Sequence, residues 1–493
     1  MTRPSRRGPF QRRSISVATS LAIGGLIALA APAAVFAHQL TGRFASPIPL
    51  GAYLVGAALA VGASFTIVFL RDAHPRPPAS TIEARTVRLA SGIRTGLLAI
   101  GVIAWLWIVV GSAILGGHSD GDPASLFLWT YGWVGLAIAS ALIGPVWAWL
   151  DPFATLHRLA AGLVRRLGID AGSSAAYPER LGTWPAVIGF AVFVWLELAV
   201  QARSGRGLGL VLVAYTVVTL VGMAQFGRDT WRRHGEVFSV WFGLVGRLAP
   251  LAPPEAGRAN RVRVRPFAIG LLDARSDLSE LALVATSIGA ILFDGLSQTQ
   301  VYFDLFGIPT VPVQTLLLFG WLGLVVGLAV GVSRLVGVGP LVAGLIPIAI
   351  GYLIAHYLTF LLFDGQRIVI ALNDPLGLGW NLFGASQFEP ATGWLPGAVV
   401  WTVQLVVVVG GHIIGAWAGH TVAVQESIGR ELGGPLADPS PAAVSGAERA
   451  VRWRQLPLAL LMVGLTALTL WSLGQAIVQT ADATAGVVRL TGG

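Results

Sequence analysis

The feature that most constrains this chain is a succession of apolar segments, each about twenty residues long and almost free of charged side chains. A helix of this length crosses the roughly 30 Å hydrocarbon core of a bilayer. Charged residues make up 12% of the chain, against about 25% in soluble domains, which excludes a soluble multidomain enzyme. We predict an all-α integral membrane protein with about ten transmembrane helices, near residues 48–70, 95–116, 125–149, 183–201, 207–226, 280–298, 311–333, 341–363, 396–420 and 455–477.

The first 37 residues have the three parts of a secretory signal sequence. Five arginines precede an apolar stretch of mostly small residues from Val17 to Ala34, and Val35-Phe36-Ala37 fits the small-x-small cleavage rule. Residues 1–37 are therefore predicted to be a signal peptide that is cleaved after Ala37, or alternatively an uncleaved signal-anchor helix. In either case residues 38–493 are predicted to form a single polytopic transmembrane domain.

The arginines decide the predicted orientation, because lysine is absent and all 33 basic residues are arginine. If successive loops alternate between the two sides of the membrane, 28 arginines fall on one side and 5 on the other. By the positive-inside rule the arginine-rich side is cytoplasmic. We predict a protein of the cytoplasmic (inner) membrane with its mature N-terminus and its C-terminus outside. The net charge of +9 then reflects topology, so the expected partner is the lipid bilayer and not a nucleic acid.

Two of the predicted loops are long enough to have structure of their own. The cytoplasmic loop 227–279 contains an apolar stretch from Val237 to Leu251, which is too short to span and is predicted to be an interfacial helix. The loop 364–395 is the one long loop expected outside, and its length favours a functional role. Two stripes with glycine at every fourth position, predicted to mark close helix packing, are Gly323, Gly327 and Gly331, and Gly411, Gly415 and Gly419.

Several polar side chains lie inside the predicted spans, where they are costly and are functional candidates by default. Counted at about 1.5 Å per residue, four of them share one layer near the outer surface, and two more lie just above it. Two carboxylates and an imidazole in such a pocket could bind a divalent metal, relay a proton or hold a cationic substrate. The alternative is interhelical hydrogen bonding that only holds the bundle together. The predicted pocket residues are Glu197, Asp294, Gln298, His356, Asp364 and Gln404.

The histidines suggest a second, separate hypothesis. The absence of cysteine excludes thiolate metal sites and disulfides, and three methionines do not suit a copper(I) pathway. Cleavage after Ala37 would make His38 the mature N-terminus, whose amine and imidazole together form a chelate that suits copper(II). A second imidazole is then needed, and an incidental His38 is the alternative. The predicted ligands for copper or another divalent metal are His38, His118, His356 and His412.

Several stretches together carry a resemblance to a known family. They are AHQLTGRFASPIPLGAYLVGAALAVGASF at 37–65, WTYGWVGLAIASALIGPVWAWLDPF at 129–153, YPERLGTWPAVIGFAVFVWLEL at 177–198, FDGLSQT at 293–299, AHYLTFLLFDGQ at 355–366 and NDPLGLGWNLFG at 373–384. The chain resembles a family of multi-pass bacterial membrane proteins whose sequences are often labelled fenitrothion hydrolase. The likeness runs over nearly the whole chain from His38 onward. It implies a bacterial inner membrane and, by the label, hydrolysis of an organophosphate.

Three function classes follow. The first is transport or metal handling, in which Glu197 and Asp294 bind a cation or proton and His356 ligates or relays. The second is a membrane-embedded hydrolase, in which His356 acts as base and the carboxylates hold a metal. The phosphotriesterase-like pattern needs an HxH motif and a bridging lysine, and the chain contains neither. The third class is a structural or assembly role, and the absence of a Walker motif weighs against an ATPase.

Overall fold

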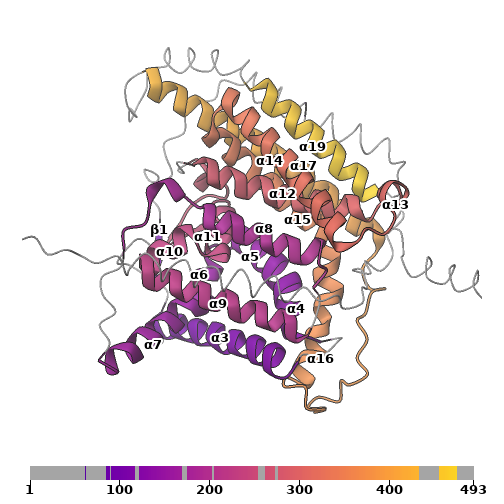
Figure 1. The fold of residues 1–493 in the computed structure, drawn as a ribbon. Coiled ribbons are helices and arrows are strands. Elements are labelled where there is room, and N and C mark those ends of the chain that lie inside the picture. The colour runs from indigo at the N-terminus through magenta and orange to yellow at the C-terminus, as the bar shows by residue number, and fades with distance from the viewer. Residues whose placement is uncertain are drawn as a thin grey trace, which may run out of the picture.

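The fold consists mainly of helices that run roughly side by side, drawn in Figure 1. The computed structural model describes residues 62, 85–88, 90–116, 121–168, 175–202, 205–253, 261–272, 276–431 and 455–474. Within these residues eight helices are long and apolar enough to cross a membrane, so the all-α membrane architecture is confirmed. They are Ser91–Ile114, Pro123–Leu142, Glu179–Leu198, Arg206–Phe226, Leu278–Ser297, Val311–Val336, Val338–Asn373 and Gly397–Ser427.

The predicted segment 455–477 corresponds to a shorter apolar helix, α19 (Leu456–Gly474). The predicted segment 48–70 and the predicted signal sequence 1–37 lie outside the described residues, apart from Gly62. The total number of spans and the cleavage after Ala37 therefore stay predictions.

A first group of spanning helices comes from the N-terminal half of the chain. In Figure 1 it lies below the second group and is coloured purple to magenta. Two of its spans contain π-helical turns, which widen the helix locally and redirect its side chains. Its elements are α3 (Ser91–Val109) with η3 (Val110–Ile114), α4 (Pro123–Ser125) with η4 (Leu126–Leu136) and α5 (Ala137–Leu142), η5 (Glu179–Leu181) with α8 (Trp184–Leu198), and α9 (Arg206–Phe226).

The second group lies above the first in Figure 1 and contains the most deeply buried spans. Its central helix α15 (Val338–Phe363) packs against α12 (Leu278–Ser297), α14 (Val311–Val336), α17 (Gly397–Glu431) and α19. A 3₁₀ turn, η7 (Asp364–Arg367), and α16 (Ile368–Asn373) extend α15 into the predicted outer loop 364–395. The helical path therefore ends about ten residues later than the apolar run predicts.

Short elements connect the spans. Three strands form a small antiparallel sheet in the order β1–β3–β2, which the all-α prediction did not include. The sheet pairs residues of two predicted cytoplasmic loops and lies at the same end of the bundle as α10 (Figure 1). The connecting elements are β1 (Arg85–Arg88), α6 (Val146–Leu150), α7 (Pro152–Arg166), α10 (Arg228–His234), α11 (Val237–Val245), β2 (Leu251–Ala252), β3 (Arg261–Val264), η6 (Ile269–Leu271) and α13 (Gln300–Phe306).

The prediction that the apolar stretch from Val237 to Leu251 forms an interfacial helix is wrong. The apolar stretch that begins at Val237 forms α11, which is buried between the first group and α15, with Trp241 only 1% exposed. Because α11 is apolar on all its faces, burial inside the bundle suits it better than an interface does. The amphipathic helix is instead α7, which exposes Leu159 and Leu163 and carries arginines on its other positions.

The two glycine stripes have different surroundings. On α17, an added Cβ at Gly411 would lie 2.7 Å from the carbonyl oxygen of Pro347, and one at Gly415 would lie 2.4 Å from that of Gly344. This stripe therefore lets α17 and α15 approach closely, as predicted. On α14, an added Cβ at Gly327 would meet no described atom within 4 Å, and the same holds for Gly323 and Gly331. The prediction of close packing at the α14 stripe is wrong within the described part of the chain.

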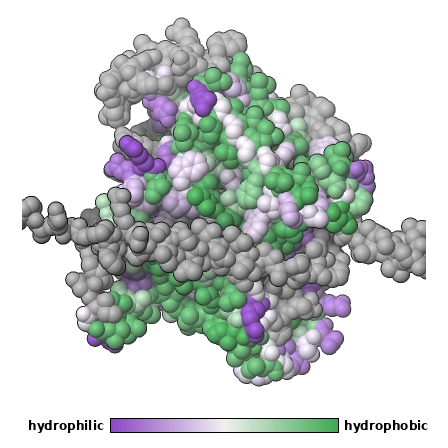
Figure 2. Space-filling model, viewed as in Figure 1, coloured by the Kyte–Doolittle hydropathy of each residue, from purple (hydrophilic) through white to green (hydrophobic). Residues whose placement is uncertain are grey.

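The outer surface of the bundle suits a lipid environment. Large aliphatic side chains of α3, α9 and α14 are exposed, among them Ile103, Val221 and Leu316. Figure 2 shows hydrophobic side chains across much of one face, with hydrophilic ones gathered mainly toward its left and right edges. Such a belt between two polar ends is what a bilayer-spanning bundle presents to lipid.

Candidate functional site

The carboxylate of Asp294 is the centre of a buried hydrogen-bond cluster between α12 and α15. Its Oδ2 atom lies 2.9 Å from Nε2 of His356 and accepts a hydrogen bond of 2.8 Å from the Tyr357 hydroxyl. Its Oδ1 atom accepts a hydrogen bond of 2.8 Å from the Gln298 amide, one helical turn further along α12. Asp294 is 4% exposed and His356 is 9% exposed. The structure therefore places three of the predicted pocket residues, Asp294, Gln298 and His356, in direct contact.

Local helix geometry explains how two neighbouring residues reach one carboxylate. His356 and Tyr357 are consecutive on α15, so their side chains point about 100° apart and approach Asp294 from two sides. Their rings meet edge to face with centroids 4.5 Å apart. Asp294 is three residues from the end of α12, or about 5 Å along the helix axis. The cluster thus lies close to the end of the bundle that is predicted to face outside.

Glu197 belongs to the surroundings of this cluster. It is buried on α8, and its carboxylate is close enough to Tyr357 to act on the hydroxyl electrostatically. The indole ring of Trp133, from the π-helical η4, packs against Tyr357 with centroids 6.3 Å apart. Tyr357 therefore donates to one of the two carboxylates that the sequence predicts for one pocket and lies within electrostatic range of the other. Tyr357 was not among the predicted pocket residues. The sequence feature that could have indicated it is a tyrosine within an apolar span, because a buried hydroxyl needs a hydrogen-bond partner.

The other two predicted pocket residues are placed elsewhere. Gln404 on α17 donates a hydrogen bond of 2.8 Å to the backbone carbonyl of Ala355, next to His356 but outside the carboxylate cluster. Asp364 begins η7, where its Oδ1 atom lies 3.5 Å from Nε of Arg367. Both therefore stay at the margin of the site.

A second polar cluster surrounds His412, which is completely buried on α17. Its Nδ1 lies 2.8 Å from the Val408 carbonyl oxygen, so Nδ1 carries the proton and Nε2 is the acceptor. Nε2 lies 2.7 Å from the Thr466 hydroxyl and 3.4 Å from that of Tyr352. Tyr352 is one helical turn from His356 on α15, so this second cluster begins one turn below the first.

Three hydroxyl residues of α19 run alongside both clusters. Thr466 lies at His412, and Ser472 lies beside Gly295, where its Oγ would be 3.1 Å from an added Cβ. Thr469, between them in sequence, is 4% exposed, and its hydroxyl interacts with the hydroxyl of Tyr352. A spacing of three residues keeps these side chains on one side of the helix. Polar groups therefore continue from Asp294 into the membrane interior.

The metal hypothesis finds no cluster in the described part of the chain. There, no three or more His, Asp or Glu side chains lie together in a way that could hold a metal ion. His356 and His412 each have protein partners, and they belong to the two separate clusters. His38 and His118 lie outside the described residues, so the predicted copper site at the N-terminus stays a prediction.

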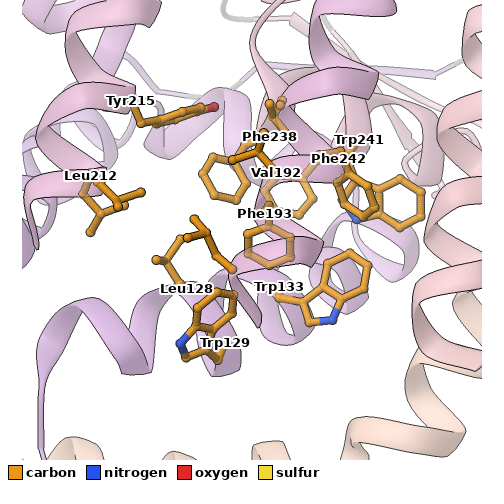
Figure 3. Close-up of a pocket in the computed structure, with 15 residues that line it drawn as sticks. Leu128, Trp129, Trp133, Val192, Phe193, Leu212, Tyr215, Phe238, Trp241 and Phe242 are labelled. Atoms are coloured by element: carbon orange, nitrogen blue, oxygen red, sulfur yellow. The ribbon is translucent and has the colours of Figure 1, made fainter. Parts of the chain in front are cut away.

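An aromatic cavity of about 70 Å³ lies within the first helix group, and Figure 3 shows its lining residues. Its walls come from η4, α8, α9 and α11, and they are almost entirely apolar. Trp133 lines the cavity and also packs against Tyr357. Its indole ring therefore lies between the cavity and the Asp294 cluster. At the Tyr215 side of the cavity the Tyr215 hydroxyl donates a hydrogen bond to the buried carboxylate of Glu236.

The comparisons with known proteins leave the function open. No protein-family model, no curated protein and no solved structure matches this chain. The resemblance to the family labelled fenitrothion hydrolase therefore stays a prediction from the motifs.

Proposed function

We propose that this protein is a transporter of the bacterial inner membrane that moves protons, with Asp294 as the proton-binding carboxylate. The observation that carries the proposal is the position of Asp294. It is a buried carboxylate inside a membrane-spanning helix, in contact with an imidazole and a phenol. Ionisable groups in such positions are costly, and in pumps and transporters they mark proton relays.

The chemistry of the partners supports this role. The His356 imidazole lies 2.9 Å from the Asp294 carboxylate, a hydrogen-bond distance over which a proton can pass between the two groups. The Tyr357 and Gln298 donors stabilise the ionised carboxylate, so that Asp294 can release a proton as well as bind one. Glu197 is a second buried carboxylate, within electrostatic range of the Tyr357 hydroxyl.

The inner end of the pathway is proposed to pass through the second cluster. Tyr352, His412 and Thr466 form a connected set of hydroxyl and imidazole groups one turn deeper in the membrane. The buried hydroxyl of Thr469, which interacts with Tyr352, extends this set along α19 toward Ser472 and the first cluster. A chain of such groups carries a proton without any large movement of the helices.

The experiment is proton flux into liposomes that contain the purified protein and a pH-sensitive dye, driven by a potassium diffusion potential. Wild-type protein should acidify the lumen, and Asp294→Asn should abolish this flux because an amide cannot bind the proton. Asp304→Asn is the matched control, since Asp304 is exposed on α13 and interacts with Gln300. Wild-type flux no greater than in empty liposomes, or unchanged flux in Asp294→Asn, would contradict the proposal.

The orientation of the protein in these liposomes can be measured in the same preparation. The chain has no cysteine, so one introduced at Gly393 in the predicted outer loop is a unique label site. An added Cβ at Gly393 meets no described atom within 4 Å, so the substitution has room. The fraction labelled by a membrane-impermeant maleimide gives the fraction of molecules with the predicted outer side exposed. The flux is then normalised to that fraction.

A further inference from the structure

A large cavity at the other end of the bundle is lined by arginines. Its volume is about 690 Å³, and its walls come from the N-terminal turns of α3, from α6, α7, α10 and α11, and from the start of α12. All of these elements lie at the end that is predicted to be cytoplasmic. The guanidinium groups that line it belong to Arg94, Arg158, Arg228, Arg232, Arg233 and Arg247.

Carboxylates neutralise only part of this positive charge. Within the described residues, Arg228 pairs with Asp229 at 2.8 Å, Arg247 pairs with Glu280 at 2.8 Å, and Arg232 pairs with Asp151 at 2.6 Å. Arg158 bonds only to the Ala154 carbonyl and the Thr155 hydroxyl of its own helix, and no carboxylate of the described residues pairs with Arg233. Arg158 and Arg233 therefore give the cavity a surplus of positive charge that no ion pair within the described residues neutralises.

Neighbouring titratable groups respond to this surplus. The pKa of Asp229 is lowered, first by the hydrogen bond from Arg228 and further by the charges of Arg232 and Arg233. The pKa of His157 on α7 is also lowered, first by burial and then by the charge of Arg228. The contributions of the neighbouring arginine charges to the two pKa shifts indicate a positive electrostatic potential in this part of the molecule.

One hydrogen-bond donor in the cavity wall has no partner within the described residues. The indole Nε1 of Trp149 is shielded from solvent and makes no hydrogen bond to any described residue. Buried donors are normally paired, so a ligand with an acceptor oxygen would satisfy it. Arginines and an indole N–H together are donors that suit a phosphate group.

The position of the cavity indicates how such a group reaches it. Beside the cavity, α7 exposes Leu159 and Leu163 on one face and carries Arg158 and Arg165 on the other, which is the pattern of a helix that lies at a membrane surface. Apolar side chains such as Leu98 and Phe242 line the cavity next to the arginines. A phosphate at this depth therefore meets both charged and apolar walls.

We propose that this cavity binds an anionic phosphate group, supplied either by the headgroup of an anionic phospholipid or by a free phosphate compound. Arg158 and Arg233 are the two cations available to the ligand without breaking an ion pair within the described chain. The proposal does not depend on the transport function, because it concerns a different set of residues at the opposite end of the bundle.

The test is ligand-dependent stabilisation of the delipidated protein in neutral detergent, followed by its intrinsic tryptophan fluorescence on heating. The probes are a short-chain phosphatidylglycerol, a short-chain phosphatidylcholine and inorganic phosphate. Phosphatidylglycerol should raise the unfolding temperature, and the Kd should increase by about tenfold or more in Arg158→Gln/Arg233→Gln. The matched control is Arg165→Gln/Arg166→Gln, which removes the same charge from exposed positions of α7 outside the cavity.

The outcomes separate the two sources of phosphate. Stabilisation by phosphatidylglycerol but not by inorganic phosphate assigns the cavity to a lipid headgroup, and stabilisation by inorganic phosphate alone assigns it to a soluble compound. Equal stabilisation by phosphatidylcholine would overturn the proposal, because the cavity would then not select negative charge. An equal loss of affinity in the control variant would also overturn it, because binding would reflect only overall charge.

Discussion

Single residues carry most of the function proposed for this protein, and the sequence predicted them unevenly. Asp294 and His356 stand out in a sequence because ionisable groups are rare inside membrane spans. Tyr357 does not stand out, since a tyrosine is compatible with an apolar helix. Gln404 was placed in the right layer, yet its amide binds the carbonyl of Ala355 and not the carboxylate. Depth along a helix follows from residue counting, whereas the direction of a side chain depends on how the helices pack.

Asp151 allows a prediction about pH at the scale of one residue. It is fully buried at the start of α7, where it accepts hydrogen bonds from the backbone N–H groups of Phe153 and Ala154. Burial raises its pKa above the ordinary 3.8, against the smaller opposite effect of Arg232. The folded protein therefore holds this proton more tightly than the unfolded chain does. The contribution to stability is complete below pH 3.8 and is lost as the pH rises through the raised pKa.

Asp151→Asn keeps the helix-capping acceptor and removes the ionisation. The unfolding temperature of the variant, relative to wild type, should therefore increase as the pH rises from about 4 toward neutral. Thermal unfolding in detergent micelles at a series of pH values measures this difference. Asp304→Asn, at an exposed position, should show no such trend. A difference between Asp151→Asn and wild type that stays constant with pH would contradict the prediction.

At the scale of elements, the length of each apolar segment predicted correctly which segments form long helices. It did not predict where a shorter apolar segment lies in the bundle. Each predicted span within the described residues corresponds to a helix, because the cost of unpaired backbone groups in lipid leaves few alternatives. The stretch beginning at Val237 was assigned to an interface because it is too short to span. In fact α11 is buried within the bundle, and nothing in its own sequence indicates which neighbours cover it.

The two glycine stripes have the same sequence pattern and different packing, which gives a matched pair of substitutions. Gly415→Ala would place a methyl group 2.4 Å from a backbone oxygen of α15 and should destabilise the protein by about 1–3 kcal/mol. Gly327→Ala meets no described atom within 4 Å and should stabilise α14 slightly, since alanine is the better helix former. Thermal unfolding followed by tryptophan fluorescence distinguishes them. Equal destabilisation by both substitutions would show that the α14 stripe is also a packed interface.

At the scale of the whole molecule, the structure joins features that are far apart in the sequence. Polar groups of α12, α15, α17 and α19 follow one another through the second helix group, while arginines surround a cavity at the opposite end from Asp294. Hydropathy and the positive-inside rule predict which segments span and which loops share a side. They do not predict the order of helices in the bundle, and so they could not connect Asp294 with His412.

The central claim is that Asp294 takes up and releases a proton, and infrared difference spectroscopy of the protein in lipid tests it most directly. Lowering the pH should produce the carbonyl stretching band of a protonated carboxylic acid in wild-type protein and in Asp304→Asn. The Asp294 component of this band should be missing from Asp294→Asn, which has an amide in place of that carboxyl group, while the components of other carboxyls such as Asp151 remain. The same band in Asp294→Asn as in wild type, or no change in the wild-type band over the whole pH range, would contradict the proposed proton-binding role of Asp294.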